Sequence, residues 1–211
     1  MDVLARSSQF NNEAIRLLAS NLFEAAEVYF EEGILTVSNL LELTAKGGNI
    51  SGFNSNNQLL TAAPPIQLSM LQVPLPSDPK RAAIPDNTKH SPIFLLYTPT
   101  YGDATPEFMK FSLAILLFNY GVAVHREATC GETSILQRAL SLYNQSMKIL
   151  LHLCSQIDCY EIVHATLKNQ SDVYYKMEDF KSMQTTMDRL LLLTTHAKGC
   201  FRPLPSAAAS A

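Results

Sequence analysis

The apolar residues near the start of the chain recur at steps of three and four, which places them along one face of an α-helix. The positions are Phe23, Ala26, Phe30, Ile34, Val37 and Leu41. They belong to a helical stretch that we expect to run from about residue 8 to about residue 45. Gly47 and Gly48 follow, and such a glycine pair ends a helix. We predict an N-terminal helical hairpin over residues 1–45.

Residues 46–105 differ in composition, because prolines punctuate this segment and Gly, Asn and Ser fill much of the rest. Proline fixes φ and removes a hydrogen-bond donor, so no helix of useful length is expected here. We interpret the segment as a long flexible insert. One piece, PIFLLY at residues 92–97, is a short apolar run that fits an ordered segment lying extended along the helices.

Helix-start signals mark the C-terminal half of the chain. Thr105-Pro106-Glu107 combines a capping residue, a proline suited to the first turn and an acid suited to the positive end of the helix dipole. The helix that it opens is expected to end before Gly131. Ser134-x-x-Gln137 matches a capping box, and Asp158-x-x-Glu161 is its Asp-led analogue. A last helix is predicted from about Phe180 to His196.

Three segments share one spacing: a small residue in a first helix, then a second helix whose apolar positions step by three, four and three. The first segment has Ala14, then Phe23, Ala26, Phe30 and Gly33. The second has Gly121, then Leu136, Ala139, Tyr143 and Ser146, and the third has Ser171, then Phe180, Met183, Met187 and Leu190. The small residue precedes the centre of the second helix by the same interval in the first and third segments, and by six residues more in the middle one.

The pieces NNEAIRLLASNLFEAAEVYFEEG, LFNYGVAVHREA with ILQRALSLYNQS, and LKNQSDVYYKMEDFKSMQTTMDRL resemble the tetratricopeptide repeat. The resemblance implies an all-α fold of antiparallel helical hairpins, stacked as a short solenoid or bundle. The hairpins would occupy residues 1–45 and 106–198, with the flexible insert between them and a disordered tail at 199–211. The repeat period departs from the family's, and no proline closes the repeats.

Stacked hairpins of this family leave a concave surface, lined by the first helices, that binds peptides. The family's groove-facing positions, carried to this sequence, give the expected partner-binding residues: Asn119, His125, Arg126, Lys168, Asn169, Asp172, Tyr175 and Lys176. Val122 also matches such a position but is apolar. Asparagine donates to a peptide backbone, and Lys or Arg pairs with acidic groups. The alternative is that each of them is an ordinary solvated helix residue.

A formal charge of −3 and a pI near 5.9 give no electrostatic reason to expect binding to nucleic acid or to a membrane. The most apolar window, from Phe111 to Val124, is shorter than the roughly 20 residues of a membrane span. We therefore expect a buried core helix, in which Gly121 is small because another helix crosses there. The cysteines lack disulfide spacing and MDVLARSSQF lacks a signal core, so we expect an intracellular location, cytoplasmic or nuclear.

The densest group of Cys and His lies in HLCSQIDCYEIVH, with His152, Cys154, Cys159 and His164. A zinc site is one interpretation, and buried structural cysteine is the default. On the predicted helices these side chains diverge by about 140–200°, which argues against convergence on a metal. The sequence contains no nucleophile elbow, dinucleotide-binding motif or phosphate loop. We expect no catalysis, no metal and no cofactor.

The sequence favours a non-catalytic adaptor or scaffold that binds a peptide or helix of another protein on a concave helical surface. A second hypothesis is a structural subunit whose groove is filled by its own insert, with PIFLLY as the occupant. A third is an enzyme whose site is assembled from distant residues. Ser91-Pro92 and Thr98-Pro99 have the form of proline-directed phosphorylation sites, and LLEL at 40–43 is a candidate self-association face.

Overall fold

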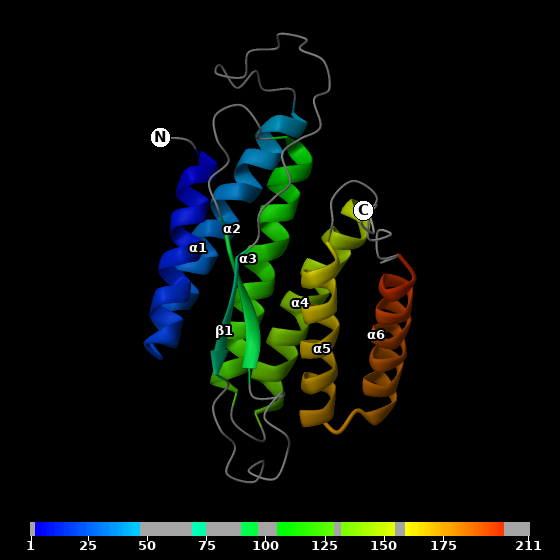
Figure 1. Cartoon of the computed structure of the whole chain (residues 1–211). Helices are drawn as coiled ribbons and strands as arrows, with labels where there is room; N and C mark the ends of the chain where they lie inside the picture. Colours follow the sequence, from blue (N-terminus) through cyan, green and yellow to red (C-terminus); the bar gives the residue numbers. More distant parts are fainter. Residues whose placement is uncertain are drawn as a thin grey trace, which may run out of the picture.

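The computed structural model describes residues 3–46, 69–74, 90–96, 105–128, 132–154 and 159–200. Within these ranges the chain forms six helices and two strands (Figure 1). In chain order they are α1 (Val3–Ala19), α2 (Phe23–Ala45), β1 (Ser69–Pro74), β2 (His90–Leu95), α3 (Pro106–Glu127), α4 (Thr133–Leu153), α5 (Tyr160–Lys176) and α6 (Phe180–Cys200). Gly47, Gly48, Thr98, Gly131, Asp158 and the tail at 201–211, for which the sequence gives expectations, lie outside the described residues.

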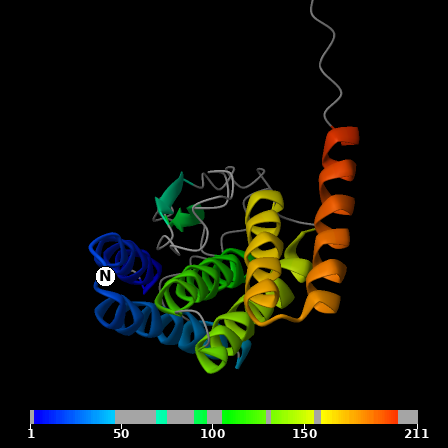
Figure 2. The same ribbon diagram turned by 90° about the horizontal axis from the view of Figure 1, so that it is seen from below.

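The helices pack in the order in which they occur, each against the next, from α1 to α6. Three hairpins result, α1–α2, α3–α4 and α5–α6, and their first helices also touch, α1 against α3 and α3 against α5. The two helices α1 and α6 form the outer edges of the stack (Figures 1 and 2). The expectation of a helical protein with neighbouring helices packed together is confirmed.

Helix α3 is the centre of the core. Its side chains are buried almost without interruption from Phe111 to Arg126, because α1, α2, α4 and α5 all contact this helix. By length and composition alone α3 is apolar enough to cross a membrane, but 83% of its most apolar window is buried inside the protein. The expected core helix is confirmed.

Two glycines mark close helix crossings. A Cβ on Gly121 would lie 2.7 Å from Cε1 of Tyr143 on α4, and one on Gly33 would lie 2.9 Å from Cδ2 of Leu116 on α3. Real Cβ atoms do not approach other heavy atoms this closely. The expectation that another helix crosses α3 at Gly121 is therefore confirmed, and Gly33 serves the same purpose between α2 and α3.

The signal for the start of α3 is confirmed, because Thr105 Oγ1 accepts a hydrogen bond from the Phe108 amide at 3.2 Å. The capping box at Ser134 is wrong. Helix α4 already begins at Thr133, so Ser134 lies inside it, and Glu132 at its N-cap makes no side-chain capping bond. At the start of α6, Asp179 Oδ1 accepts from the Ser182 amide at 3.1 Å.

The first and third hairpins turn in the same way. Asn21 and Glu178 both have positive φ, 58° and 60°. In each turn the amide of this residue bonds the carbonyl three positions earlier, and the next amide bonds the carbonyl five positions earlier. This pair of bonds is the Schellman motif. The equal spacing of the first and third sequence segments reflects this shared turn.

The segment expected to be a flexible insert contains two antiparallel strands, which corrects that expectation for residues 69–74 and 90–96. Only the extended course of PIFLLY was anticipated; β1 was not. Phe94 of β2 lies opposite Met70 of β1, and Pro92 lies opposite Gln72. The Phe94 amide points to the helices rather than to β1. Pro92, two residues earlier, has the same orientation, so its missing N–H costs no bond between the strands.

Candidate functional site: the face formed by the first helices

Strand β2 lies across the first helices of all three hairpins. It contacts α1, α3 and α5, and both views place the strand pair on the same side of the stack (Figures 1 and 2). Ile93, Phe94 and Leu96 are buried there, with exposed fractions of 0%, 0% and 3%. The face formed by the first helices therefore holds an extended segment of the same chain.

The side-chain amide of Asn119 on α3 binds both backbone groups of Phe94. Its Oδ1 accepts from the Phe94 amide at 3.1 Å, and its Nδ2 donates to the Phe94 carbonyl at 2.7 Å. Asn11 on α1 donates to the same carbonyl at 3.2 Å and accepts from Asn119 Nδ2 at 2.8 Å. Asn119 is fully buried, so these bonds satisfy polar groups that have no access to water.

Asn12, one residue further along α1, repeats this arrangement on Leu96. Its Nδ2 donates to the Leu96 carbonyl at 3.1 Å, and its Oδ1 accepts from the Leu96 amide at 3.3 Å. Asn11, Asn12 and Asn119 together form what we call the asparagine cluster. The cluster binds the edge of β2 that faces away from β1, where side-chain amides take the place of a neighbouring strand.

The asparagine cluster follows the internal repeat. Asn12, Asn119 and Asn169 each lie two residues before the small residue of their hairpin. The strand runs across the hairpins at a step of two residues, so Leu96 meets the first hairpin and Phe94 meets the second. The same step leads next to Pro92, which has no N–H to donate.

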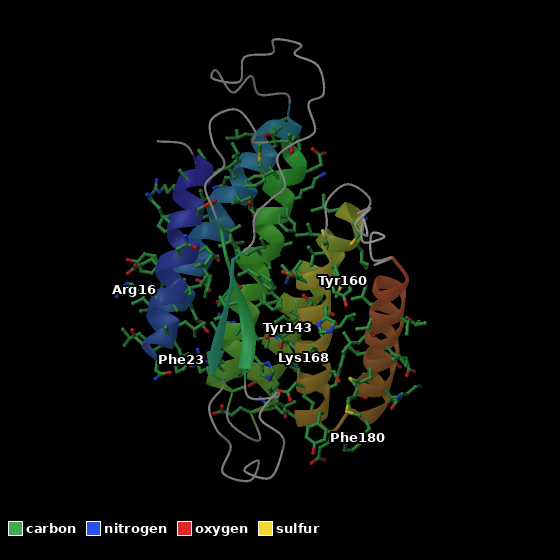
Figure 3. The ribbon with its side chains drawn as sticks, in the orientation of Figure 1. Arg16, Phe23, Tyr143, Tyr160, Lys168 and Phe180 are labelled. Atoms are coloured by element: carbon green, nitrogen blue, oxygen red, sulfur yellow. The ribbon has the colours of Figure 1, made fainter. Side chains whose placement is uncertain are left out.

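Aromatic side chains extend from β2 into the interior. The Phe94 ring packs edge-on against Phe118 of α3, with centroids 5.3 Å apart, and Phe118 contacts Tyr143 of α4 at 5.8 Å. Tyr143 in turn packs against His125 at 6.2 Å. This chain of rings connects β2 to the junction between the second and third hairpins, where Figure 3 marks Tyr143.

Four of the predicted partner-binding residues meet at that junction. His125 is buried, and its Nε2 lies 2.9 Å from Lys176 Nζ and 3.2 Å from Asp172 Oδ2 of α5. Asn169 Nδ2 donates to Tyr143 Oη at 3.3 Å. His125 Nε2 thus lies between the Lys176 ammonium and the Asp172 carboxylate, and Nδ1 lies 3.4 Å from Tyr143 Oη.

Burial raises the pKa of Tyr143 well above its usual value; the nearby Asp172 acts in the same direction, and the bond from Asn169 acts against it. The phenol therefore stays neutral in the folded protein. Lys176 Nζ also lies 3.4 Å from Asp172 Oδ2, and both side chains are partly exposed at the edge of α5. The network joins α3, α4 and α5, and only its Lys176–Asp172 end reaches solvent.

Arg126 does not lie on the face that β2 covers, although the resemblance implies a groove-facing position for it. Its side chain is buried against the first hairpin, where Nη1 donates to the Leu18 carbonyl at 3.4 Å and the guanidinium lies 5.6 Å from the centre of the Phe23 ring. Burial lowers its pKa. Its Nε has no hydrogen-bond partner among the described residues. Arg126 therefore holds the end of α1 against α3.

The other predicted residues are placed as follows. Lys168 is half-buried on α5 (Figure 3), and Tyr175 is exposed, with its ring against Phe180. Val122 is fully buried. The sequence interpretation missed Asn11, Asn12 and Tyr143 as members of the site. Asn12 carried a readable signal, since it precedes Ala14 by the interval at which Asn119 precedes Gly121.

The Cys/His group does not assemble in the part of the chain that is described. Cys159 is buried and Cys154 exposed, and His152 Nδ1 lies 2.7 Å from the Lys148 carbonyl of its own helix. Among described residues no three His, Cys, Asp or Glu side chains gather as a metal site. An open hollow on α4, lined by residues including Ser141 and Asn144, is separate from the asparagine cluster.

Comparison of the chain with protein-family models, with curated proteins and with solved structures gives no match.

Proposed function

We propose that this chain is a non-catalytic protein-interaction module of the tetratricopeptide type, whose concave face binds an extended chain segment and holds its own strand β2 as an internal ligand. One observation carries the proposal: Asn119 and Asn12 each bind both backbone groups of one strand residue, Phe94 and Leu96. Because such bonds use only the backbone, they suit any extended segment that approaches in this register.

The packing order of the helices supports the tetratricopeptide type. Consecutive helices pair, the first helices line one face, and a glycine on α3 admits Tyr143 of α4 at the closest crossing. One helical hairpin cannot bury its apolar face alone, whereas a stack of three forms a continuous core. The position of β2 across α1, α3 and α5 is the position that the family resemblance gives to a bound peptide.

The side chains of β2 define the partner that the face would accept. Phe94 fills a closed site against Phe118, and Leu96 is buried two residues later. A partner segment would be extended, with an aromatic residue followed at the second position by an aliphatic one. A residue with an N–H at the place of Pro92 would add a donor directed toward α5.

An internal ligand competes with an external one. A segment joined to the face by its own chain acts at an effective concentration of the order of millimolar, so an external segment binds only when β2 is released or outcompeted. The proposal thus combines the adaptor with the self-filled groove: β2 completes the resting protein, and a partner replaces it.

The test uses a fluorescent peptide with the sequence HSPIFLLY, residues 90–97, as the external segment. We expect weak binding to the wild-type protein and binding about tenfold or more tighter to the Asn12→Ala variant, in which β2 loses both Leu96 bonds while Asn119 stays intact. A peptide with Asp in place of Phe94 is the matched control and should not bind. A Pro92→Ala peptide should bind more tightly than HSPIFLLY.

Two results decide against the proposal. One is the absence of peptide binding to both wild-type and Asn12→Ala protein at millimolar concentration, with helicity by circular dichroism unchanged. The other is unaltered peptide binding when Asn119→Leu is added to Asn12→Ala, since the bonds of Asn119 are then unnecessary. Either result would leave β2 as a fixed structural element.

A further inference from the structure

The two ends of the helical stack differ in their outer surfaces. On α1, the exposed positions between Val3 and Ala19, themselves both exposed, are polar and include Arg6, Gln9 and Arg16. Stacked helical repeats close their ends with such polar faces. On α6, at the other end, Phe180, Met187 and Leu191 are exposed by 57%, 45% and 64%. The exposed surface of α1 is therefore mostly polar, whereas that of α6 carries several large apolar side chains.

Three exposed apolar residues of α6 form one stripe, and the exposed Leu192 lies beside it. Met187 follows Phe180 by seven residues and Leu191 by eleven, so all three lie within about 40° around the helix axis. Gln184 lies between them on the same side. Tyr175, the exposed aromatic residue of α5, contacts the Phe180 ring at 6.3 Å and continues the stripe beyond the start of α6.

In the first two hairpins, the residue equivalent to Met187 of the stripe is buried under another helix. Met187 occupies the place of Phe30 on α2 and Tyr143 on α4, which are both fully buried. Phe30 stacks on Tyr120 of α3, and Tyr143 accepts a bond from Asn169 of α5. In both cases the next helix of the chain covers the residue. On α6 the equivalent residue is half exposed.

We propose that the α6 stripe, defined as Phe180, Gln184, Met187 and Leu191, pairs with the same stripe of a second copy in an antiparallel two-fold dimer. A two-fold axis between Gln184 and Met187 places Phe180 opposite Leu191 of the second copy and Gln184 opposite Met187. The two Phe180–Leu191 pairs then form apolar contacts at both ends of the interface. Because both copies use the same surface, the dimer cannot add further copies through it.

The charges beside the stripe favour a second copy over an unrelated helix. Lys181 and Asp188 are exposed, seven residues apart, and lie on the same flank of the stripe. Two antiparallel helices related by a two-fold axis bring the same flanks together. Lys181 of each copy then faces Asp188 of the other, which gives two reciprocal ion pairs. Head-to-tail stacking is disfavoured because the exposed side chains of α1 are mostly polar.

The test is the mass of the full chain in solution, by sedimentation velocity from about 1 to 200 µM, the range in which a small interface dissociates. We expect the mass to rise with concentration from 23.4 kDa toward twice that value. Met187→Glu should hold the protein at the monomer mass with unchanged helicity. Leu43→Glu is the matched control, because Leu43 on α2 is 57% exposed but lies far from the stripe.

A charge exchange tests the antiparallel register. Lys181→Glu alone places two carboxylates opposite each other and should weaken the dimer, and Asp188→Lys alone should weaken it by placing two ammonium groups together. The double variant restores both pairs and should dimerise as the wild type does. A monomer at every concentration, a dimer that persists in Met187→Glu, loss of the dimer in Leu43→Glu or a double variant weaker than both single ones would each overturn the proposal.

Discussion

The Asn119 side chain binds the Phe94 amide and the Phe94 carbonyl together, at 3.1 and 2.7 Å, although 25 residues separate the two along the chain. An asparagine side chain offers one acceptor and two donors, which match the spacing of the two backbone groups of one extended residue. Asn119 thereby binds the strand through its backbone, while the Phe94 side chain packs against apolar residues such as Phe118.

Asn119→Leu should destabilise the protein by roughly 2–4 kcal/mol, because it leaves the buried Phe94 amide without a partner and leaves the Phe94 carbonyl only its bond from Asn11. Urea unfolding measures this change. Asn12→Ala is the comparison and should cost roughly 0.5–1.5 kcal/mol, since the Leu96 bonds lie nearer to solvent. Equal losses in the two variants would contradict the difference in burial.

Gly121→Ala should destabilise the fold by about 1–3 kcal/mol, because the new methyl group meets the rigid ring of Tyr143 at 2.7 Å. Gly33→Ala should cost less. Its methyl group meets the end of the Leu116 side chain at 2.9 Å, and that side chain can rotate away. Thermal unfolding of the two variants side by side checks the order.

Glu178→Gly should stabilise the protein by roughly 1 kcal/mol, since glycine adopts the left-handed backbone conformation at φ 60° without the steric penalty of a side chain. Asn21→Gly changes the equivalent turn of the first hairpin and should gain less, because asparagine tolerates this conformation better than glutamate. Chemical denaturation of both variants provides the measurement. A loss of stability in Glu178→Gly would contradict the turn geometry.

Tyr143 predicts a dependence of stability on alkaline pH. Its folded pKa is raised by burial, so its contribution is complete below the unfolded pKa of about 10 and is lost as the pH rises from there toward the folded pKa. The melting temperature of the wild type should therefore fall more steeply between about pH 9 and 11 than that of Tyr143→Phe. Parallel slopes would show that the Tyr143 phenol is not responsible.

The helical hairpins were predictable because their signals are local. Apolar steps of three and four, the Thr105 cap and the small size of Gly121 each act within one helix or one crossing, and all are confirmed. The placement of Arg126 was not predictable from the repeat, because the Phe23 ring and the Leu18 carbonyl draw it to the first hairpin.

The asparagine cluster required knowledge of β2. Asparagine two residues before the small residue of each hairpin is visible in the sequence, but its meaning depends on which segment lies across the helices. Proline density in residues 46–105 excluded helices and said little about strands. The strand pairing depends on contacts between residues far apart in the chain, which no local pattern of β1 encodes.

Pro92 has a consequence for the accuracy of strand pairing. In the observed alignment its nitrogen faces the helices, and the N–H groups of Ile93 and Leu95 remain available to β1. A slip of β2 by one residue would turn Pro92 toward β1, where a donor is needed. The proline thus acts against misregistered folding: the alternative alignment loses a hydrogen bond before any side chain is considered.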